Sequence, residues 1–244
     1  MQAEEYANME RHEATHWYYA GKRVIARRWL ELAGPPRPDQ LLLDCGAGTG
    51  RFAKEMEACC RVLVLDDHEE ALRLLRGKFR ADQILSLAGD QVPLPAGSLD
   101  YVTALDVLEH TPDDRAVVAG FARLLKPGGV ALVTVPASMA LWSDWDVSLH
   151  HYRRYSQPQL QAIFPAAQWE LLHVNYTNVV VYPVVWLIRK WRKLFASPAR
   201  TEDAEPPRWL NAILQRLFVD MALWRTPLPF GVSLILVARR RAAQ

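Results

Sequence analysis

Short apolar runs alternate with amphipathic stretches of helical spacing between Gln40 and Gly129, and this alternation restricts the fold more than any other feature of the sequence. Such an order is typical of parallel βαβ units, in which helices cover both faces of a sheet and its strands are apolar throughout. Strands are predicted at residues 41–43, 61–65, 84–88, 101–105 and 130–135, and helices at 51–59, 69–79 and 113–125. The last helix is expected to end at Lys126-Pro127-Gly128-Gly129, which would turn the chain into the next strand. The sequence therefore predicts an α/β protein with a doubly wound sheet.

Two more strands, at residues 169–176 and 232–239, lie on either side of an insertion that we place at about residues 179–228. The insertion contains two helical patterns rich in tryptophan and arginine, at residues 184–195 and 209–224. At the start of the chain, residues 4–32 are predicted to be helical up to the breaker Gly34-Pro35-Pro36. We therefore expect an N-terminal helical lid over residues 1–36 and one domain over residues 37–244 that carries the insertion.

Composition excludes several classes of protein. Half of the 244 residues are hydrophobic, enough for one substantial core, and 29 basic residues nearly balance 27 acidic ones, so nucleic acid is not expected as a partner. The three cysteines lack metal-ligand spacing and are interpreted as reduced thiols of a cytoplasmic protein, and no metal is expected. No apolar run reaches the roughly 20 residues that span a bilayer, and the first residues lack the apolar core of a signal peptide.

A glycine-rich turn, Asp-Cys-Gly-Ala-Gly-Thr-Gly at residues 44–50, connects the first predicted strand to the helix that follows. Small residues there let the backbone approach a ligand closely. A dinucleotide site would need a glycine at position 51, which is Arg51, so the turn favours a ligand without pyrophosphate. An acid at the end of the strand suits a cationic amino acid, although an ordinary βα turn is the alternative. The predicted ligand-binding residues of this segment are Asp44, Gly46, Ala47, Gly48 and Gly50.

Acidic residues follow the next two predicted strands. Asp66 ends the second strand about 20 residues after the turn, where a carboxylate can accept hydrogen bonds from both ribose hydroxyls. Asp67, the next residue, is the alternative acceptor for the ribose hydroxyls. Asp90 and Gln91 follow the third strand, where a carboxylate would lie near the exocyclic amine of an adenine. A lone acid in a loop more often caps a helix, but the order of strand, turn, strand, acid, strand and acid favours a nucleoside site.

These segments, together with residues 99–110 (LDYVTALDVLEH) and 125–129 (LKPGG), resemble successive motifs of class I S-adenosylmethionine-dependent methyltransferases, especially the small-molecule enzymes. The resemblance covers about half of the chain and implies a Rossmann-like seven-stranded sheet whose last strand is antiparallel. It implies S-adenosylmethionine (SAM) as cofactor and S-adenosylhomocysteine as product, with Asp66 at the ribose and Asp90 with Gln91 at the adenine. Asp106 would lie near the methyl group, a helix cap being the alternative.

The segment His16-Trp-Tyr-Tyr-Ala-Gly-Lys-Arg23 resembles an HWWY-like helix that precedes the domain in one branch of that family. Trp17, Tyr18 or Tyr19 could cover the sulfonium, whose positive charge is attracted to an aromatic face, and Trp17 and Tyr19 are included in the predicted cofactor site. Lys22 or Arg23 could bind the methionyl carboxylate. The alternative is an amphipathic helix that packs its aromatic residues on the sheet.

The loop after the fifth predicted strand resembles the H-x-R-R-Y-[ST] segment of the same branch. Ligands of open α/β sheets bind just beyond the carboxyl ends of strands, so this loop is the candidate acceptor site. A histidine can accept a hydroxyl proton and arginines can hold an anionic substrate. His151 is therefore the predicted catalytic residue, and the predicted substrate-binding residues are His150, Arg153, Arg154 and Tyr155. Alternatively, the arginines pair with neighbouring acids and Ser156 caps the next helix, while Glu109 and His110 are expected to organise their loop rather than do chemistry.

The sequence thus predicts methyl transfer from SAM to a small-molecule acceptor, with a hydroxyl on a lipid-like or saccharide-linked metabolite as the preferred acceptor. An NAD(P)-dependent oxidoreductase or epimerase would share the strand, turn and acid, but the third glycine and a Tyr-x-x-x-Lys pair are missing. A non-catalytic binding module would not need the intact turn with both acids.

The insertion also suggests a surface role. Residues 179–188 are apolar but too few to cross a bilayer, and residues 184–195 mix basic with aromatic side chains. This mixture favours peripheral contact with the inner face of a membrane. A substrate lid or a homodimer contact would have the same periodicity and remains the alternative.

Overall fold

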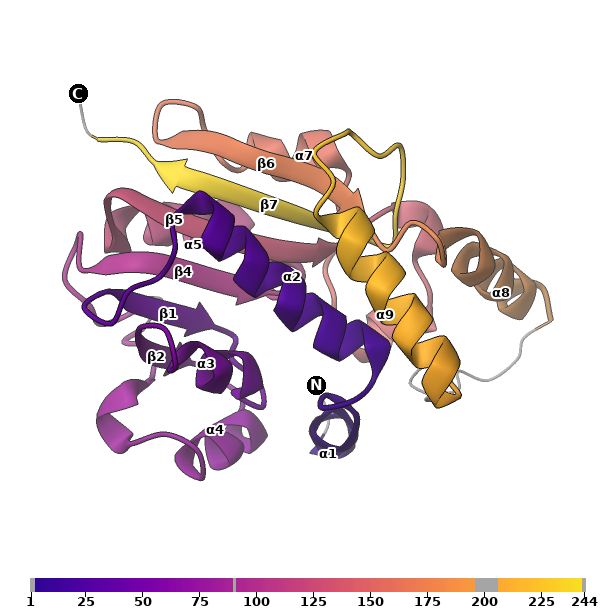
Figure 1. The fold of residues 1–244 in the computed structure, drawn as a ribbon, viewed down its shortest axis with the longest axis horizontal. Coiled ribbons are helices and arrows are strands. Elements are labelled where there is room, and N and C mark those ends of the chain that lie inside the picture. Colours follow the sequence, from indigo (N-terminus) through magenta and orange to yellow (C-terminus); the bar gives the residue numbers. More distant parts are fainter. Residues whose placement is uncertain (1–2, 90, 196–205, 243–244) are drawn as a thin grey trace.

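The computed structural model describes residues 3–89, 91–195 and 206–242 and shows a sheet with helices on both of its faces (Figure 1). The strands are β1 (Leu41–Cys45), β2 (Arg61–Leu65), β3 (Ile84–Leu85), β4 (Leu99–Leu105), β5 (Leu125–Pro136), β6 (Trp169–Thr177) and β7 (Ser233–Arg240). The α-helices are α1 (Ala3–His12), α2 (Trp17–Ala33), α3 (Arg51–Met56), α4 (Glu69–Arg76), α5 (Asp114–Leu124), α6 (Asp144–Ser148), α7 (Gln157–Ala162), α8 (Tyr182–Phe195) and α9 (Arg208–Ala222). Three short 3-10 helices are η1 (Ala81–Gln83), η2 (Leu108–His110) and η3 (Met139–Leu141).

The strands form one seven-stranded sheet in the order β3-β2-β1-β4-β5-β7-β6, and β7 runs antiparallel to both of its neighbours. The predicted sheet, including its antiparallel last strand, is confirmed. Strands β1, β2 and β4 are parallel, so their carboxyl ends meet at one edge of the sheet. The chain winds outward from β1 in one direction and from β4 in the other, and open sheets bind ligands at such a switch point.

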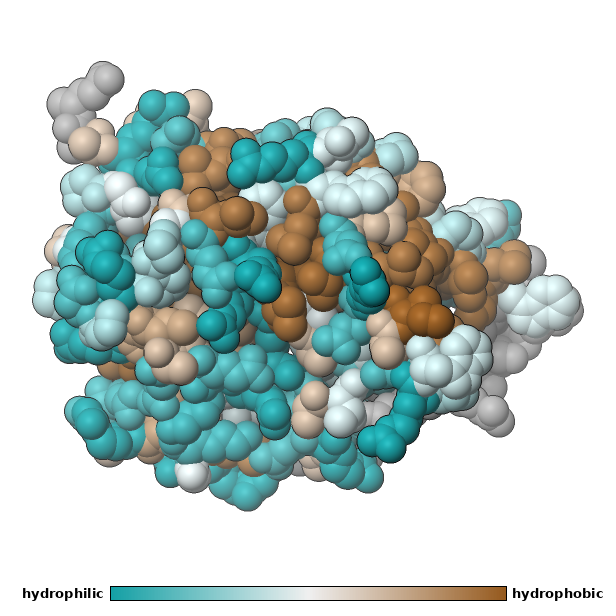
Figure 2. Space-filling view, in the orientation of Figure 1, coloured by the Kyte–Doolittle hydropathy of each residue, from teal (hydrophilic) through white to brown (hydrophobic). Residues whose placement is uncertain are grey.

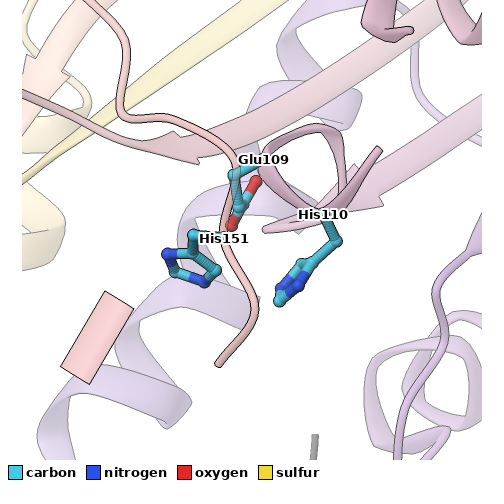
Figure 3. Close-up of side chains that lie close together, drawn as sticks. All are labelled: Glu109, His110 and His151. Carbon is cyan, nitrogen blue, oxygen red and sulfur yellow. The ribbon is translucent and has the colours of Figure 1, made fainter. Parts of the chain in front are cut away.

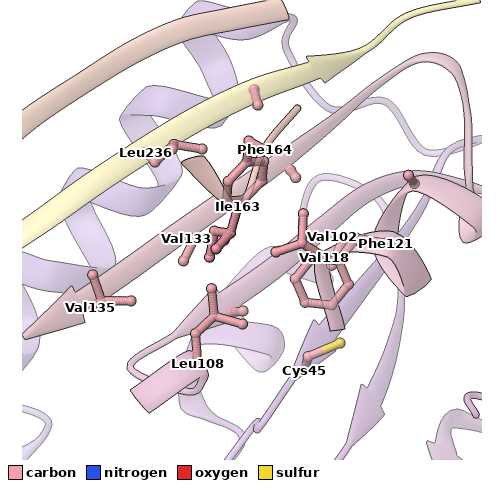
Figure 4. Packing of buried hydrophobic residues seen from close by; sticks show 14 of the residues in the cluster. Cys45, Val102, Leu108, Val118, Phe121, Val133, Val135, Ile163, Phe164 and Leu236 are labelled. Carbon is pink, nitrogen blue, oxygen red and sulfur yellow. The ribbon is translucent and has the colours of Figure 1, made fainter. Parts of the chain in front are cut away.

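The side chains of successive strand residues point to opposite faces of the sheet. They therefore pack into two separate hydrophobic cores, one on each face. One face packs against α5 and α7, with Val102, Val133 and Leu236 at its centre (Figure 4). The opposite face packs against α2, α3 and α9. Residues that neighbour the first set along the strands, such as Val237, belong to this second core. Both faces are therefore covered, which is why the central strands are apolar throughout.

Three elements differ from the sequence-based expectation. The N-terminal stretch forms two helices instead of one, because His16 adopts an extended conformation and its side chain caps α2 by accepting from the Tyr18 N–H. Strand β3 is only two residues long. The expected turn after α5 belongs to β5, since Leu125 pairs with Leu99 and the register then shifts before Tyr101.

The insertion between β6 and β7 supplies α8 and α9. Helix α9 lies beside α2 on one face of the sheet (Figure 1), where Phe218 and Ala222 are buried and the Trp29 indole donates to the Ala222 carbonyl at 3.0 Å. Helix α8 lies toward the end of the molecule near η3. Among the described helices, none is both long enough and apolar enough to cross a membrane.

A buried polar pair connects β1 to β4. The Thr103 hydroxyl donates to the Asp44 carboxylate at 2.6 Å, and both side chains are closed off from solvent. Burial raises the pKa of Asp44 to about 7, an effect that outweighs the hydrogen bond from Thr103. At neutral pH the free protein therefore holds Asp44 near its titration point.

This pair predicts a pH dependence of stability. The unfolded chain releases the Asp44 proton near its ordinary pKa of about 4, whereas the folded chain retains it up to about pH 7. The free energy of unfolding should therefore fall as pH rises through this window, by up to about 1.4 kcal/mol per pH unit from this group. Asp44→Asn keeps an acceptor for Thr103 and should flatten the slope in urea titrations between pH 5 and 7. Equal slopes for the two proteins would contradict the assignment.

Candidate functional site

The glycine turn lies at the carboxyl end of β1 and has three left-handed glycines. Gly46, Gly48 and Gly50 have φ values of 63°, 57° and 77°. A Cβ on Gly46 would lie 2.5 Å from Val107, and one on Gly50 would lie 2.6 Å from Leu75, so internal packing requires both glycines. A Cβ on Gly48 would meet nothing within 4 Å. The backbone at Gly48 therefore faces open space, which is the arrangement needed for close approach to a ligand.

Asp66, at the end of β2, holds this turn in place. Its carboxylate accepts from the Gly48 N–H at 2.8 Å and from the His68 N–H at 3.0 Å. Burial raises the pKa of Asp66. Neighbouring Asp67 is exposed, so Asp66 is the acid that the structure brings to the turn. Each carboxylate oxygen still has lone-pair capacity for another donor.

The predicted adenine-side residues are less informative. Asp90 lies outside the described residues. Gln91 is exposed and its backbone pairs with that of Ala88 in an isolated bridge. Their role therefore stays a prediction from the resemblance.

Asp106 lies directly after β4 in a left-handed conformation with φ of 58°. Its carboxylate receives the Lys22 ammonium at 2.6 Å, the Thr134 hydroxyl at 2.9 Å and the Tyr18 hydroxyl at 3.5 Å. Burial alone would raise the pKa of Asp106, but Lys22 and these hydrogen bonds hold it below its ordinary value. In return, the carboxylate raises the pKa of Lys22 against the opposing effect of burial. Lys22 is thus paired within the protein, and Asp106 is a fixed negative charge beside the turn.

The N-terminal helices reach the same edge of the sheet. The Glu13 carboxylate contacts the Thr49 hydroxyl within the turn, and Arg23 donates to the Glu13 carbonyl at 2.6 Å. Tyr18, with Lys22 and Asp106, lines a small pocket between α2, α9 and the sheet. The structure therefore places Tyr18 against Asp106.

The two aromatic residues chosen for the predicted cofactor site occupy other positions. The Trp17 ring packs edge-on against Phe218, and the backbone N–H of Trp17 donates to the Asn211 side-chain oxygen of α9 at 2.8 Å. The Tyr19 ring contacts those of His16 and Tyr18. Their role toward a cofactor stays a prediction, and the contacts of Trp17 agree with the alternative of aromatic packing.

The loop after β5 is organised around the fully buried carboxylate of Asp146 in α6. This carboxylate accepts from His151 Nδ1 at 3.0 Å and from Arg154 Nε at 2.7 Å, and Arg189 of α8 lies 3.4 Å away. Burial raises the pKa of Asp146, but His151 and Arg154 lower it further. An ionised Asp146 makes His151 Nδ1 a donor, so the unprotonated nitrogen is Nε2.

The other predicted acceptor-side residues mainly contact the protein itself. Arg153 pairs with Asp114 at 2.8 Å and donates to two backbone carbonyls. Arg154 is buried against Asp146 and the Ala137 carbonyl. Tyr155 is buried and donates to Asp114 at 2.8 Å. These contacts match the structural alternative for the two arginines, whereas the roles of Tyr155 and of exposed His150 toward a substrate stay predictions.

The sequence predicted only that Glu109 and His110 organise their loop. In the structure both residues lie beside His151 (Figure 3). The rings of His110 and His151 meet edge to face with centroids 4.6 Å apart. Burial and neighbouring His151 lower the pKa of His110 to about 4. Burial, with Asp106 nearby, raises the pKa of Glu109 well above its ordinary range. The signal in the sequence was the Leu-Glu-His run after Asp106, but its approach to His151 depends on the folded loop.

The domain that carries this site is similar to known methyltransferases. A family model described as a methyltransferase domain matches residues 43–133, which span β1 to β5. A ubiquinone biosynthesis O-methyltransferase of Xanthomonas oryzae pv. oryzae is 27% identical over 221 residues, covering 73% of this chain and 87% of that protein.

Two solved structures share the fold. A SAM-dependent methyltransferase from Thermotoga maritima has a TM-score of 0.63, with 16% identity, and the match covers 98% of this chain and 95% of that one. Geranyl diphosphate C-methyltransferase from Streptomyces coelicolor A3(2) has a TM-score of 0.58, with 13% identity, and covers 88% of this chain and 78% of that one. The matched domain, the order of the sheet and these relatives together support a class I SAM-dependent methyltransferase.

Proposed function

We propose that this enzyme transfers the SAM methyl group to a hydroxyl oxygen of a small molecule, with His151 as the general base or substrate orienter. The observation that carries the proposal is the contact between His151 Nδ1 and buried Asp146, which leaves Nε2 as the acceptor nitrogen. His151 lies beside Glu109 and His110, which follow Asp106 in the chain. The O-methyltransferase relatives from Xanthomonas support oxygen as the acceptor atom.

The residues at the glycine turn fit the cofactor. The open space before Gly48 accommodates a ligand against the backbone, and Asp66 at its rim can accept from ribose hydroxyls. Asp106 would attract the cationic sulfonium or ammonium group, and the Tyr18 hydroxyl lies 3.5 Å from its carboxylate. We assign the turn, Asp66 and Asp106 as the cofactor site. The sequence also predicts cofactor contacts for Trp17, Tyr19, Asp67, Asp90 and Gln91.

SAM supplies an electrophilic methyl group, so the protein needs only to align the acceptor and remove its proton. In our proposal the acceptor hydroxyl would donate its proton to His151 Nε2 as its oxygen bonds to the methyl carbon, while the bond from that carbon to sulfur breaks and its electron pair stays on sulfur. Asp146 fixes the orientation of the imidazole and stabilises the imidazolium that forms. Arg154 keeps Asp146 ionised and thereby supports the same function.

The cofactor assignment predicts that Gly48→Leu abolishes SAM binding while the sheet remains folded. A side chain at this position would occupy the open space and strain a backbone with positive φ. Gly128→Leu is the matched control, because Gly128 also has positive φ and open surroundings but lies in the exposed start of β5. Calorimetry with SAM and, separately, NAD measures the outcome. Unchanged SAM affinity in Gly48→Leu would reject the site, and preferential NAD binding would favour an oxidoreductase.

The acceptor assignment predicts that His151→Ala lowers turnover roughly a hundredfold or more, because the proton acceptor is lost, while SAM affinity is retained. The substrate is first identified by incubating the enzyme and methyl-labelled SAM with fractionated cell extract and locating the label on an oxygen. Tyr152→Ala removes an exposed neighbour and should leave turnover near wild type. Label on nitrogen or carbon would contradict O-methylation, and unchanged turnover in His151→Ala would make His151 structural.

We further propose that α8 and α9 contact an anionic membrane surface and admit a lipid-like acceptor. Val184, Leu187, Ile188 and Trp191 are exposed at helical spacing along α8, with exposed fractions of 57%, 59%, 43% and 60%. Trp209, Ile213 and Leu217 are exposed at similar spacing along α9. Figure 2 shows hydrophobic side chains gathered over this part of the molecule.

The charges of α8 correct part of the sequence-based expectation. Arg189, predicted to meet headgroups, is buried and donates to the Leu141 carbonyl. Lys190 is exposed and lies over the Trp186 ring at 4.7 Å. The side chains of Arg192 and Lys193 lie outside the described ones. Helix α8 therefore exposes its apolar side chains to solvent and directs Arg189 into the protein. Lys190 lies beside the exposed apolar side chains.

Membrane contact predicts that the full chain cosediments with phosphatidylglycerol vesicles at low salt. The double variant Leu187→Glu, Trp191→Glu should bind the vesicles roughly tenfold or more weakly, because two large apolar side chains no longer enter the membrane interface. Leu32→Glu is the control, since Leu32 is equally exposed but lies on α2. Absence of binding by the wild type would reject the proposal. A dimer that the double variant dissociates in sedimentation would instead identify the homodimer alternative.

A further inference from the structure

Glu109 has a buried carboxyl group that its surroundings at the candidate site do not compensate. Its side chain is 1% exposed, and neither carboxylate oxygen has a hydrogen-bond partner among the described residues. A carboxyl group is costly to bury without hydrogen bonds or a positive partner, so native proteins rarely leave one in this state. Glu109 therefore suggests a ligand that the protein chain itself does not provide.

The neighbours of Glu109 indicate the nature of that ligand. Glu109 and His110 come from η2 and His151 comes from the loop after α6, and one ligand atom of each lies within 4.8 Å of the others (Figure 3). Two imidazoles and one carboxylate are the donor set of many first-row transition-metal sites. Ligand atoms around a tetrahedral cation are roughly 3.4 Å apart for bonds of about 2.1 Å, so small side-chain rotations would close the site.

Asp146 provides a second, independent observation. It accepts from His151 Nδ1 at 3.0 Å and is itself anchored by Arg154 at 2.7 Å. Metal-binding histidines commonly donate their other ring nitrogen to a carboxylate, which fixes the tautomer and directs the free nitrogen toward the cation. The contact that holds His151 in the proposed reaction is thus also the contact expected behind a metal ligand.

We propose that Glu109, His110 and His151 bind one divalent cation of the Zn²⁺ type. Mg²⁺ prefers oxygen ligands in octahedral geometry and fits this nitrogen-rich set poorly. Three protein ligands leave a position open for the acceptor oxygen, as in catalytic zinc sites.

This inference rests on the proposed O-methylation and changes the part played by His151. In the cation-bound enzyme the hydroxyl is deprotonated at the metal, its proton passes to solvent, and His151 is a ligand rather than the proton acceptor. The oxygen then forms its bond to the methyl carbon as the bond from that carbon to sulfur breaks, and the bonding pair stays on sulfur.

The test begins with the full chain treated with a chelator and dialysed, then titrated with Zn²⁺, Co²⁺ and Mg²⁺ in a calorimeter. We expect one Zn²⁺ per chain, a visible Co²⁺ spectrum of low coordination number, and binding of Mg²⁺ at least a hundredfold weaker. Glu109→Gln and His110→Ala should each weaken Zn²⁺ binding at least tenfold. Tyr152→Ala, which removes an exposed side chain beside His151, should not change it. Circular dichroism verifies that each variant is folded.

Failure of this inference is distinguishable from failure of the proposed function. Absence of stoichiometric Zn²⁺ binding, or binding unchanged in both Glu109→Gln and His110→Ala, would overturn the cation site. In that case, the general-base proposal would still hold if the enzyme transferred the methyl group fully after treatment with the chelator and lost this activity in His151→Ala. Absence of O-methylation alongside specific Zn²⁺ binding would reject the proposed reaction and retain the cation site.

Discussion

The ion pair between Asp106 and Lys22 is the contact on which the rest of the site depends. Asp106 follows β4, Lys22 belongs to α2, and Thr134 of β5 completes the arrangement, so one carboxylate connects three elements distant in the sequence. The pair closes α2 over the carboxyl edge of the sheet and fixes a negative charge between the glycine turn and the Glu109 cluster. Because both partners are largely buried, removing one would leave the other uncompensated, a far larger cost than that of a surface ion pair.

The sequence was sufficient for the features that depend on local order. The alternation of apolar runs reflects burial on both faces of a parallel sheet, and it predicted β2 with its exact bounds and β1, β4, β6 and β7 to within two residues at each end. The glycine turn was recognisable because its conformation is set by residues adjacent in the chain. Even here, packing against Val107 and Leu75, which explains two of the three glycines, could be seen only after folding.

Contacts between segments distant in the sequence were not predictable in the same way. Periodicity identified α8 as amphipathic but not which face turns inward, and the buried contact of Arg189 with Asp146 reverses the simple expectation for a basic residue. The arginines of the acceptor loop could bind an anion, but their guanidinium groups already pair with neighbouring carboxylates and backbone carbonyls. Conversely, Glu109 looked like an ordinary loop residue until the chain brought His151, 42 positions later, against it.

Asp146 has one more consequence through its position between the surface and the site. Arg189 from α8 and His151 from the acceptor loop share its carboxylate, so the helix with the exposed apolar stripe and the histidine are electrostatically linked. A displacement of α8 would withdraw Arg189 from Asp146, and it would therefore act on the same carboxylate that orients the His151 ring.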